Sequence, residues 1–335
     1  MDKSKDNIRV QQWVVAVALL LFALKLVAYF LTQSVAILTD ALESIVNVIS
    51  GFIGLYSLTV AAKPRDVDHP YGHGKAEFLS AAVEGALVLM AGLIIIYEAV
   101  YNLIFPHAIQ KLDKGIFLVG ITALINFAVG AVCLNRGRRN QSMALVASGK
   151  HLQSDTYSTA GIIMGLLIIL WTKLKWMDSA ISLLFAGIII YTGYHILRSS
   201  IAGIMDEADL QLLNRMIAYL NRNRRPNWVD MHNLRVIKYG RLLHIDCHLT
   251  VPWYLNVQEA HAEIDAFTSL IRNEFGEDLE FFVHSDACME FSCAICIKED
   301  CGVRQHPLVG RVEWTLENVV SNKKHRAQLV LENSK

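Results

Sequence analysis

The sequence has no excess of charge of either sign, because 31 lysine and arginine residues balance 31 aspartate and glutamate residues. Without a basic excess, it lacks the electrostatic signature of a nucleic-acid-binding protein. It also lacks internal repeats and Ser/Gly-rich linkers, so domain boundaries have to be found from composition. No cleavable signal peptide is expected, because residues 1–9 lead into a long apolar run with no small-residue cleavage site.

Apolar residues make up 53% of the chain and concentrate before about residue 200. A bilayer requires roughly 20 mostly apolar residues per helix, and six stretches are long enough: Val10–Leu31, Ser34–Ala61, Glu77–Leu103, Gly115–Leu134, Met143–Trp171 and Met177–Leu197. We therefore predict an α-helical membrane domain of six transmembrane helices at residues 1–200. A soluble domain at 201–286 and a Cys-rich tail at 287–335 follow it.

Basic residues predict the orientation of these helices. They cluster before the first helix and in the second and fourth connections, at Lys3, Lys5, Arg9, Lys63, Arg65, Lys75, Arg136, Arg138 and Arg139. The opposite loops carry only Lys111, Lys114, Lys173 and Lys175. By the positive-inside rule both termini are cytoplasmic, and the predicted location is the plasma (inner) membrane.

Two pairs of polar residues interrupt the second and fifth apolar stretches. Glu43 and Asn47 are four residues apart, as are His151 and Asp155, so each pair lies on one face of its helix. Ionisable groups in membrane helices are costly and usually mark an ion or proton pathway. The alternative is that they only hold helices together through interhelical hydrogen bonds. We expect the two faces to surround one small cation.

The connection AAKPRDVDHPYGHGKAEF between the second and third stretches carries Asp66, His69 and His73. One carboxylate and two imidazoles suit zinc and related divalent ions. Gly72 and Gly74 flank His73 and allow a tight backbone course. The alternative is a polar cytoplasmic loop whose histidines are simply solvated.

After residue 200 the periodicity predicts a small α+β domain in the order α-β-β-α-β. The expected elements are helices at Asp206–Leu220 and Val257–Phe275 and strands at Met231–Tyr239, Arg241–Val251 and Leu279–His284. In the second strand apolar and polar residues alternate, as in a half-buried strand. A further short strand is expected at Trp314–Val320, and the last residues, including 322–326, are expected to form a solvated tail.

Four of the six cysteines, Cys288, Cys293, Cys296 and Cys301, form the pattern C-x4-C-x2-C-x4-C. Four thiolates at short spacing suit tetrahedral zinc. The first part of the pattern is also similar to the plant-type iron–sulfur spacing. Four reduced thiols without a ligand are the remaining alternative.

The segments SVAILTDALESIVN, DHPYGHGKAEF and HLQSD, in this order within six helices, resemble the cation diffusion facilitator family. The resemblance extends to about Asp286. It implies a homodimeric exporter of divalent metal, with a cytoplasmic ferredoxin-like domain and metal exchanged against protons. By position it implies transport ligands at Glu43, Asn47, His151 and Asp155, and a loop metal site at Asp66, His69 and His73. It implies cytoplasmic-domain ligands at His232, His248, His261, His284 and Asp286, joining two protomers through bound metal.

Asn47 departs from the zinc members of this family, which commonly carry Asp at that position. Carboxylate and carbonyl donors favour manganese or iron, whereas His151 keeps zinc and cobalt possible substrates. Asp40, one turn before Glu43, is interpreted as a compensating acid or a proton relay rather than a ligand.

The sequence thus predicts proton-coupled efflux of zinc, manganese, iron or cobalt from the cytoplasm, with no covalent chemistry. The alternative from another class is a membrane-anchored metal or redox sensor that uses the cysteines and moves no metal. A passive channel, insensitive to a proton gradient, is a third interpretation.

Overall fold

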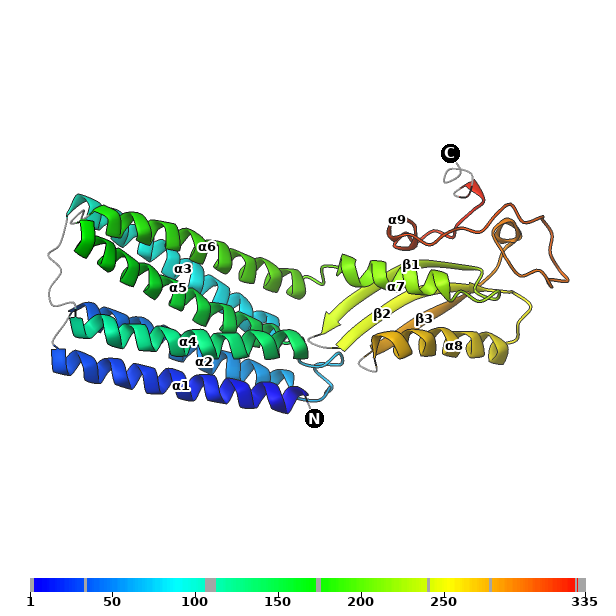
Figure 1. Cartoon of the computed structure of the whole chain (residues 1–335). Coiled ribbons are helices and arrows are strands. Elements are labelled where there is room, and N and C mark those ends of the chain that lie inside the picture. The colour runs from blue at the N-terminus through cyan, green and yellow to red at the C-terminus, as the bar shows by residue number, and fades with distance from the viewer. Residues whose placement is uncertain are drawn as a thin grey trace. The chain divides into compact units, whose positions relative to one another are not determined.

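The computed structural model describes residues 3–32, 35–105, 113–172, 176–239, 242–276, 279–328 and 330. Within these ranges it does not describe the side chains of residues 3, 28–32, 35–43, 46, 98, 102, 113–119, 158, 162–172, 176–179, 181, 182 and 185. The chain divides into two compact units, Met1–Met205 and Asp206–Lys335 (Figure 1).

The first unit is a bundle of long helices, as the apolar stretches predict. They are α1 (Lys3–Thr32), α2 (Val35–Ala61), α3 (Ala76–Ile104), α4 (Asp113–Asn140), α5 (Met143–Thr172) and α6 (Trp176–Ile204). In the described part of the chain, Ser4–Val27, Ala76–Tyr101 and Gly120–Asn140 are long and apolar enough to cross a membrane. Several helices extend beyond the apolar stretches, so basic residues such as Arg138 and Arg139 lie in the last turn of α4.

Small residues let the helices of this bundle approach closely, as is usual in membranes. On α3, a Cβ atom added at Gly85 would lie 2.7 Å from the backbone nitrogen of Leu197 on α6. On α6, a Cβ at Gly193 would lie 2.8 Å from the backbone nitrogen of Leu89 on α3. Because both positions are glycine, α3 and α6 can pack backbone against backbone.

The second unit has the predicted order of elements, which confirms the α+β ferredoxin-like fold. Its elements are α7 (Leu210–Arg222), β1 (Asp230–Tyr239), β2 (Leu242–Val251), α8 (Val257–Phe275), β3 (Leu279–Ala287), the 3₁₀ helix η1 (Glu290–Ala294) and α9 (Leu316–Val319). The strand order is β1-β2-β3, with β1 antiparallel and β3 parallel to β2.

One face of this sheet carries the hydrophobic core. Ile245, Cys247 and Leu249 of β2 are buried in one cluster with residues of α7 and α8, including Phe267, whose ring meets that of Trp228 edge-on at 5.2 Å. Since side chains alternate along a strand, the intervening His244 and His248 belong to the other face. The fold therefore separates an apolar, helix-covered face from a face rich in histidines and carboxylates.

The structure corrects the sequence analysis at three places in this unit. The helix expected from Asp206 begins at Leu210, because the Asp209 side chain accepts a hydrogen bond from the Leu212 backbone N–H and caps it. The strand expected at Trp314–Val320 is wrong. Those residues include the single helical turn α9, started by a capping box between Thr315 and Asn318.

The expectation of a solvated tail at 322–326 is also wrong for His325. His325 is 3% exposed, and its ring lies 2.5 Å from a carboxylate oxygen of Asp230 on β1. Trp314 is likewise buried in the core of this unit, with the Arg224 guanidinium 4.1 Å above its ring centroid. The tail thus packs against the domain that precedes it.

Candidate metal sites

Three of the four residues predicted as transport ligands, Asn47, His151 and Asp155, converge between α2 and α5. Asn47 on α2 donates a hydrogen bond through Nδ2 to Asp155 Oδ2 at 2.6 Å, and its Oδ1 lies 2.7 Å from Nε2 of His151. His151 Nε2 and Asp155 Oδ2 are 3.8 Å apart. Spacing of four residues on α5 places His151 and Asp155 on one face. The structure therefore brings together an amide, an imidazole and a carboxylate inside the bundle.

Two other predicted residues of this region, Glu43 and Asp40, have side chains outside the described part of the structure. His151 is 6% exposed, and its Nδ1 has no hydrogen-bond partner among the described residues. The second nitrogen of a metal-ligating histidine usually donates to a carboxylate, carbonyl or water.

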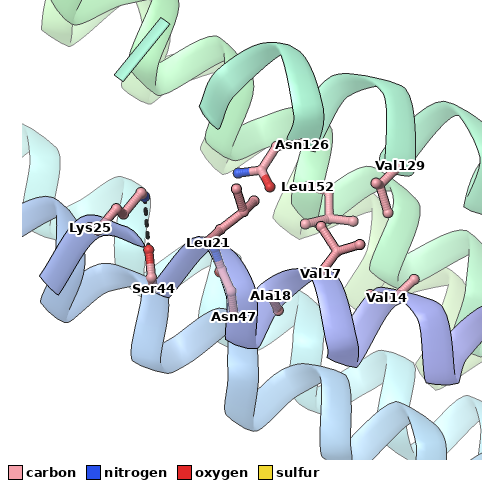
Figure 2. Close-up of a pocket in the computed structure, with 10 residues that line it drawn as sticks. All are labelled: Val14, Val17, Ala18, Leu21, Lys25, Ser44, Asn47, Asn126, Val129 and Leu152. Carbon is pink, nitrogen blue, oxygen red and sulfur yellow. Dashed lines mark hydrogen bonds between the residues drawn. The ribbon is translucent and has the colours of Figure 1, made fainter. Parts of the chain in front are cut away.

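A narrow pocket lies beside Asn47, between α1, α2, α4 and α5 (Figure 2). Most of its lining is apolar, but Asn126 of α4 faces the same pocket as Asn47. At one end, Lys25 Nζ donates to Ser44 Oγ at 2.8 Å. The sequence analysis missed Lys25 and Asn126. A lysine within the first apolar stretch was the available signal, because a charge in a membrane helix requires a partner.

The predicted loop site is assembled between α2 and α3. His69 Nδ1 lies 3.0 Å from Asp66 Oδ1, and His73 Nε2 lies 3.3 Å from Asp66 Oδ2. One ligand atom from each of the three residues lies within 4.8 Å of the others. Gly72 adopts a φ of 86°, which lets the chain turn between the two histidines.

Slight desolvation raises the pKa of the Asp66 carboxyl, but hydrogen bonds from the backbone and ring of His69 outweigh it. The pKa therefore lies below its usual range. An ionised carboxylate beside two imidazoles, exposed to solvent, can bind a divalent cation with little desolvation.

A second compact group lies on the polar face of the soluble-domain sheet. The strand register pairs His232 on β1 with His248 on β2, and His248 with His284 on β3. Two residues further along, it pairs Thr250 with Asp286. Asp286 Oδ2 is 3.2 Å from His248 Nδ1 and 3.4 Å from His232 Nε2. These three residues place a ligand atom each within 4.8 Å of one another.

The other two predicted ligands of this domain differ in position. His284 is more exposed, and its Nε2 lies 3.9 Å from Asp286 Oδ1. His261 lies on α8, paired with Asp265 at 3.7 Å. Because α8 packs on the apolar face of the sheet, His261 is not brought to the other histidines of its own chain.

A buried carboxylate lies behind His232. Asp230 Oδ2 is 3.6 Å from His232 Nδ1, while Oδ1 contacts the His325 ring and Oδ2 accepts the His325 backbone N–H at 2.9 Å. Burial raises the pKa of Asp230, but the nearby His232 ring and the hydrogen bonds from His325 outweigh it and hold the pKa well below its usual range. A carboxylate on the far nitrogen of a histidine orients its ring for metal binding.

The four tail cysteines lie near one another, but their sulfur atoms are not close enough together to bind one metal ion without moving. All six cysteines of the chain are free thiols. The Cys288 and Cys293 sulfurs accept backbone N–H groups from Trp253 and Gln305 at 3.4 and 3.5 Å. Among the described residues, the groups whose ligand atoms lie within 4.8 Å of one another are the loop and sheet groups above, without the cysteines.

The loop that carries these cysteines is nevertheless fixed. Arg304 donates to the backbone carbonyls of Cys293, Cys296 and Lys298 at 2.7–2.9 Å. Burial raises the pKa of the Cys288 thiol, and the nearby charges of the other three cysteines raise it further. The donor chemistry fits zinc, which would have to draw the sulfurs closer.

Comparison with known proteins gives two family matches that together span most of the chain. Residues 12–205 match the cation efflux transmembrane domain, and residues 211–288 match the cytoplasmic domain of cation efflux proteins. The tail from residue 289 lies beyond both matches.

Individual relatives agree with these matches. An uncharacterised transporter from Synechocystis is 34% identical over 262 residues, covering 77% of this chain and 83% of that protein. The cation-efflux pump FieF of Escherichia fergusonii is 30% identical over 285 residues, 82% of this chain and 90% of the pump. A cadmium, cobalt and zinc/H(+)-K(+) antiporter from Bacillus velezensis is 29% identical over 178 residues, 53% of this chain and 56% of the antiporter.

Proposed function

Because the chain belongs to the cation diffusion facilitator family of divalent-cation exporters, we propose that it moves a transition-metal cation out of the cytoplasm in exchange for protons. The observation that carries this proposal is the convergence of Asn47, His151 and Asp155 between α2 and α5. The Bacillus velezensis relative, a cadmium, cobalt and zinc/H(+)-K(+) antiporter, supports the exchange of metal against protons.

The geometry supports a simple competition between metal and protons. Metal binds an imidazole nitrogen and a carboxylate only when both are free of protons, so each proton that arrives displaces metal. His151 is the natural carrier, because histidine changes charge near physiological pH. In this mechanism Glu43 completes the site, and Asp40 relays protons. The protein then rocks to expose the site to the opposite face, and an inward proton gradient drives export.

The substrate is one of zinc, manganese, iron or cobalt. Asn47 supplies a neutral oxygen in place of a carboxylate, which favours manganese or iron, whereas the His151 nitrogen suits zinc and cobalt. Asp66, His69 and His73 collect the cation at the cytoplasmic end of α2. The matched cytoplasmic domain favours a homodimer in the plasma (inner) membrane, with both termini cytoplasmic.

In the soluble unit we propose that His232, His248 and Asp286 hold a regulatory metal, with His284 nearby and His261 available to a second copy. The Asp230 carboxylate would hold the His232 ring in place. We also propose that Cys288, Cys293, Cys296 and Cys301 bind a structural or regulatory zinc ion, the alternative being an iron–sulfur cluster. The N–H groups of Trp253 and Gln305 that point at two of the sulfurs would stabilise thiolates.

The decisive experiment is metal flux into proteoliposomes, with zinc, manganese, iron(II) and cobalt tested with and without a proton gradient. We expect gradient-driven flux that is abolished by His151→Ala and by Asp155→Ala. The matched control is Thr156→Val, since Thr156 lies on the same helix but turns its hydroxyl to the backbone carbonyls of Leu152 and Ala123. Metal binding without flux of any ion would favour the sensor, and flux that ignores the gradient would favour a channel.

A further inference from the structure

A carboxylate that the proposed mechanism does not use is buried inside the bundle. Glu84 lies in the first third of α3 and is 1% exposed. Its Oε1 accepts a hydrogen bond from the hydroxyl of Ser148 on α5 at 2.8 Å. Its Oε2 is fully buried and has no hydrogen-bond partner among the described residues. An intramembrane acid of this kind marks a functional site more often than a structural one.

A second unpartnered oxygen belongs to Gln11 of α1, which is 0% exposed. Its Nε2 donates to the Gly51 carbonyl at 3.1 Å and to Ser148 Oγ at 3.4 Å, while its Oε1 has no partner among the described residues. A Cβ added at Gly54 would lie 2.7 Å from the same Nε2, so glycine leaves room for this amide. Gln11 and Glu84 therefore reach the same hydroxyl from two helices.

This group lies close to the transport residues. Ser148 precedes His151 by three residues on α5, so the two levels are about 4.5 Å apart along the helix axis. Since α5 runs from the cytoplasmic end inward, Ser148 lies on the cytoplasmic side of His151. A cation that enters from the cytoplasm would reach this level first.

Polar side chains connect the group to the cytoplasmic end of the bundle. Glu77, Ser80 and Glu84 follow one another at three and four residues on α3, so they share one face. Glu77 Oε2 accepts a hydrogen bond from Ser142 at 2.5 Å, and Ser80 Oγ donates to Ser57 Oγ of α2 at 2.9 Å. Together with Glu84 and Ser148, these bonds form a polar seam between α3 and the helices α2 and α5.

Interhelical hydrogen bonding alone does not explain the group. Helix-stabilising polar residues satisfy each other across the interface, and a buried acceptor without a donor costs about 1–3 kcal/mol. Here two acceptors, one of them on a carboxylate, remain without donors. Both side chains contact Ser148, and a cation bound beside this hydroxyl could accept both free oxygens as ligands.

We propose that Glu84, Gln11 and Ser148 form a second cation station, which holds a divalent metal on its way from the cytoplasm to the transport residues. The station offers a carboxylate, an amide carbonyl and a hydroxyl, a donor set of oxygens that suits hard divalent ions such as Mn²⁺ with several waters retained. The inference rests on the proposed transport function and deepens it by adding a site on the same path.

The test has a binding arm that does not depend on transport. Full-length protein with the transport site removed by His151→Ala and Asp155→Ala is crystallised or imaged with Mn²⁺, and anomalous scattering locates the ion. We expect a Mn²⁺ peak beside the Glu84 carboxylate, lost in Glu84→Gln and retained in Glu84→Asp. Absence of a peak at Glu84 while Mn²⁺ occupies the loop or sheet residues would overturn the proposal.

The transport arm measures initial flux against cation concentration in proteoliposomes, with the ion that the unmodified protein carries. We expect Glu84→Gln to raise KM about tenfold with kcat changed far less, because the station acts before the transport site. Ser148→Ala should change KM in the same direction. The matched control is Ser200→Ala, which removes a similarly buried hydroxyl that, among the described residues, donates to the Ile196 carbonyl of its own helix.

The outcomes separate the two proposals. An unchanged KM in Glu84→Gln, with flux intact, would overturn the station alone. A changed pH profile with an unchanged KM would make Glu84 a proton carrier and would also overturn it. No flux in the unmodified protein would refute the transport function. The anomalous Mn²⁺ peak would still test binding at Glu84, because it does not depend on transport. If Glu84→Gln does not fold, Ser148→Ala provides the comparison for loss of the site, with Glu84→Asp as the variant that retains it.

Discussion

Replacing Asn47 by aspartate would turn a favourable contact into a repulsive one. Asn47 Nδ2 donates to Asp155 Oδ2 at 2.6 Å. In Asn47→Asp an oxygen stands in place of that donor, so two carboxylates face each other inside the bundle. A bound cation relieves their repulsion, as does a proton at low pH, so the titration is done at pH 8, where the variant gives the cation a second charged ligand. Both effects act in the same direction, toward tighter metal binding.

The size of the effect follows from this contact. A hydrogen bond to a charged acceptor contributes about 1.5–3 kcal/mol, so the metal-free variant should be destabilised by about 2 kcal/mol from this loss alone. If metal binding removes that strain, the dissociation constant falls by about 30-fold, since 1.4 kcal/mol corresponds to a factor of about ten. The gain should be greatest for zinc and cobalt, and release of metal, hence turnover, should slow.

The assay is metal titration of the detergent-purified protein by calorimetry, together with unfolding temperature in chelator and in saturating metal. Asn140→Asp is the matched control, because Asn140 Nδ2 donates to the Asp6 carboxylate at 3.1 Å. Asn140→Asp creates the same kind of repulsion, but between α4 and α1 and not between α2 and α5. It should lower the stability of the protein without tightening metal binding. An unchanged or weaker dissociation constant in Asn47→Asp, for every ion, would refute the reasoning.

Two further predictions concern the soluble unit. Burial lowers the pKa of His325, but its hydrogen bond to Asp230 and that carboxylate's charge outweigh burial and raise the pKa. A raised pKa stabilises the fold at pH values below the pKa of the unfolded chain, about 6.5, and this contribution is lost as the pH rises through the pKa of the folded protein. The loss of unfolding free energy in His325→Gln, measured in urea, should therefore be larger at pH 6 than at pH 9. An equal loss of unfolding free energy at pH 6 and at pH 9 would contradict this prediction. Cys293→Ser with Cys296→Ser should lose about one zinc per chain by elemental analysis, whereas Cys133→Ala should not. Retention of zinc in the double variant, or visible absorption typical of an iron–sulfur cluster in the unmodified protein, would contradict the zinc assignment.

Much of the fold could be predicted because its signals are local. The helix Val257–Phe275 was predicted at its observed bounds, since Asn256 and Glu259 form a capping box at its start and Gly276, with a φ of 95°, follows its end. Alternation along β2 likewise indicated which residues belong to the core. Such patterns depend on neighbours within a few residues, so a single sequence contains them.

What the sequence did not indicate depends on partners far apart in the chain. His325 is buried because Asp230, 95 residues earlier, accepts its hydrogen bonds. Glu84 was not selected because its hydrogen-bond partner Ser148 lies on another helix, 64 residues later in the chain. Trp314 suggested a strand by composition, yet its burial beneath Arg224 is a tertiary contact. Pattern analysis therefore found the paired acids and histidines and missed the single buried ones.

The histidines of the soluble sheet occupy one rung across three strands, His232 opposite His248 and His248 opposite His284. Side chains alternate faces along each strand, so a slip of one residue would turn a histidine into the hydrophobic core and an apolar side chain outward. The metal that we propose for this face would therefore depend on strand alignment. A chain that folds with a shifted strand would lose that site, and a bound ion that bridges neighbouring strands would oppose the shift.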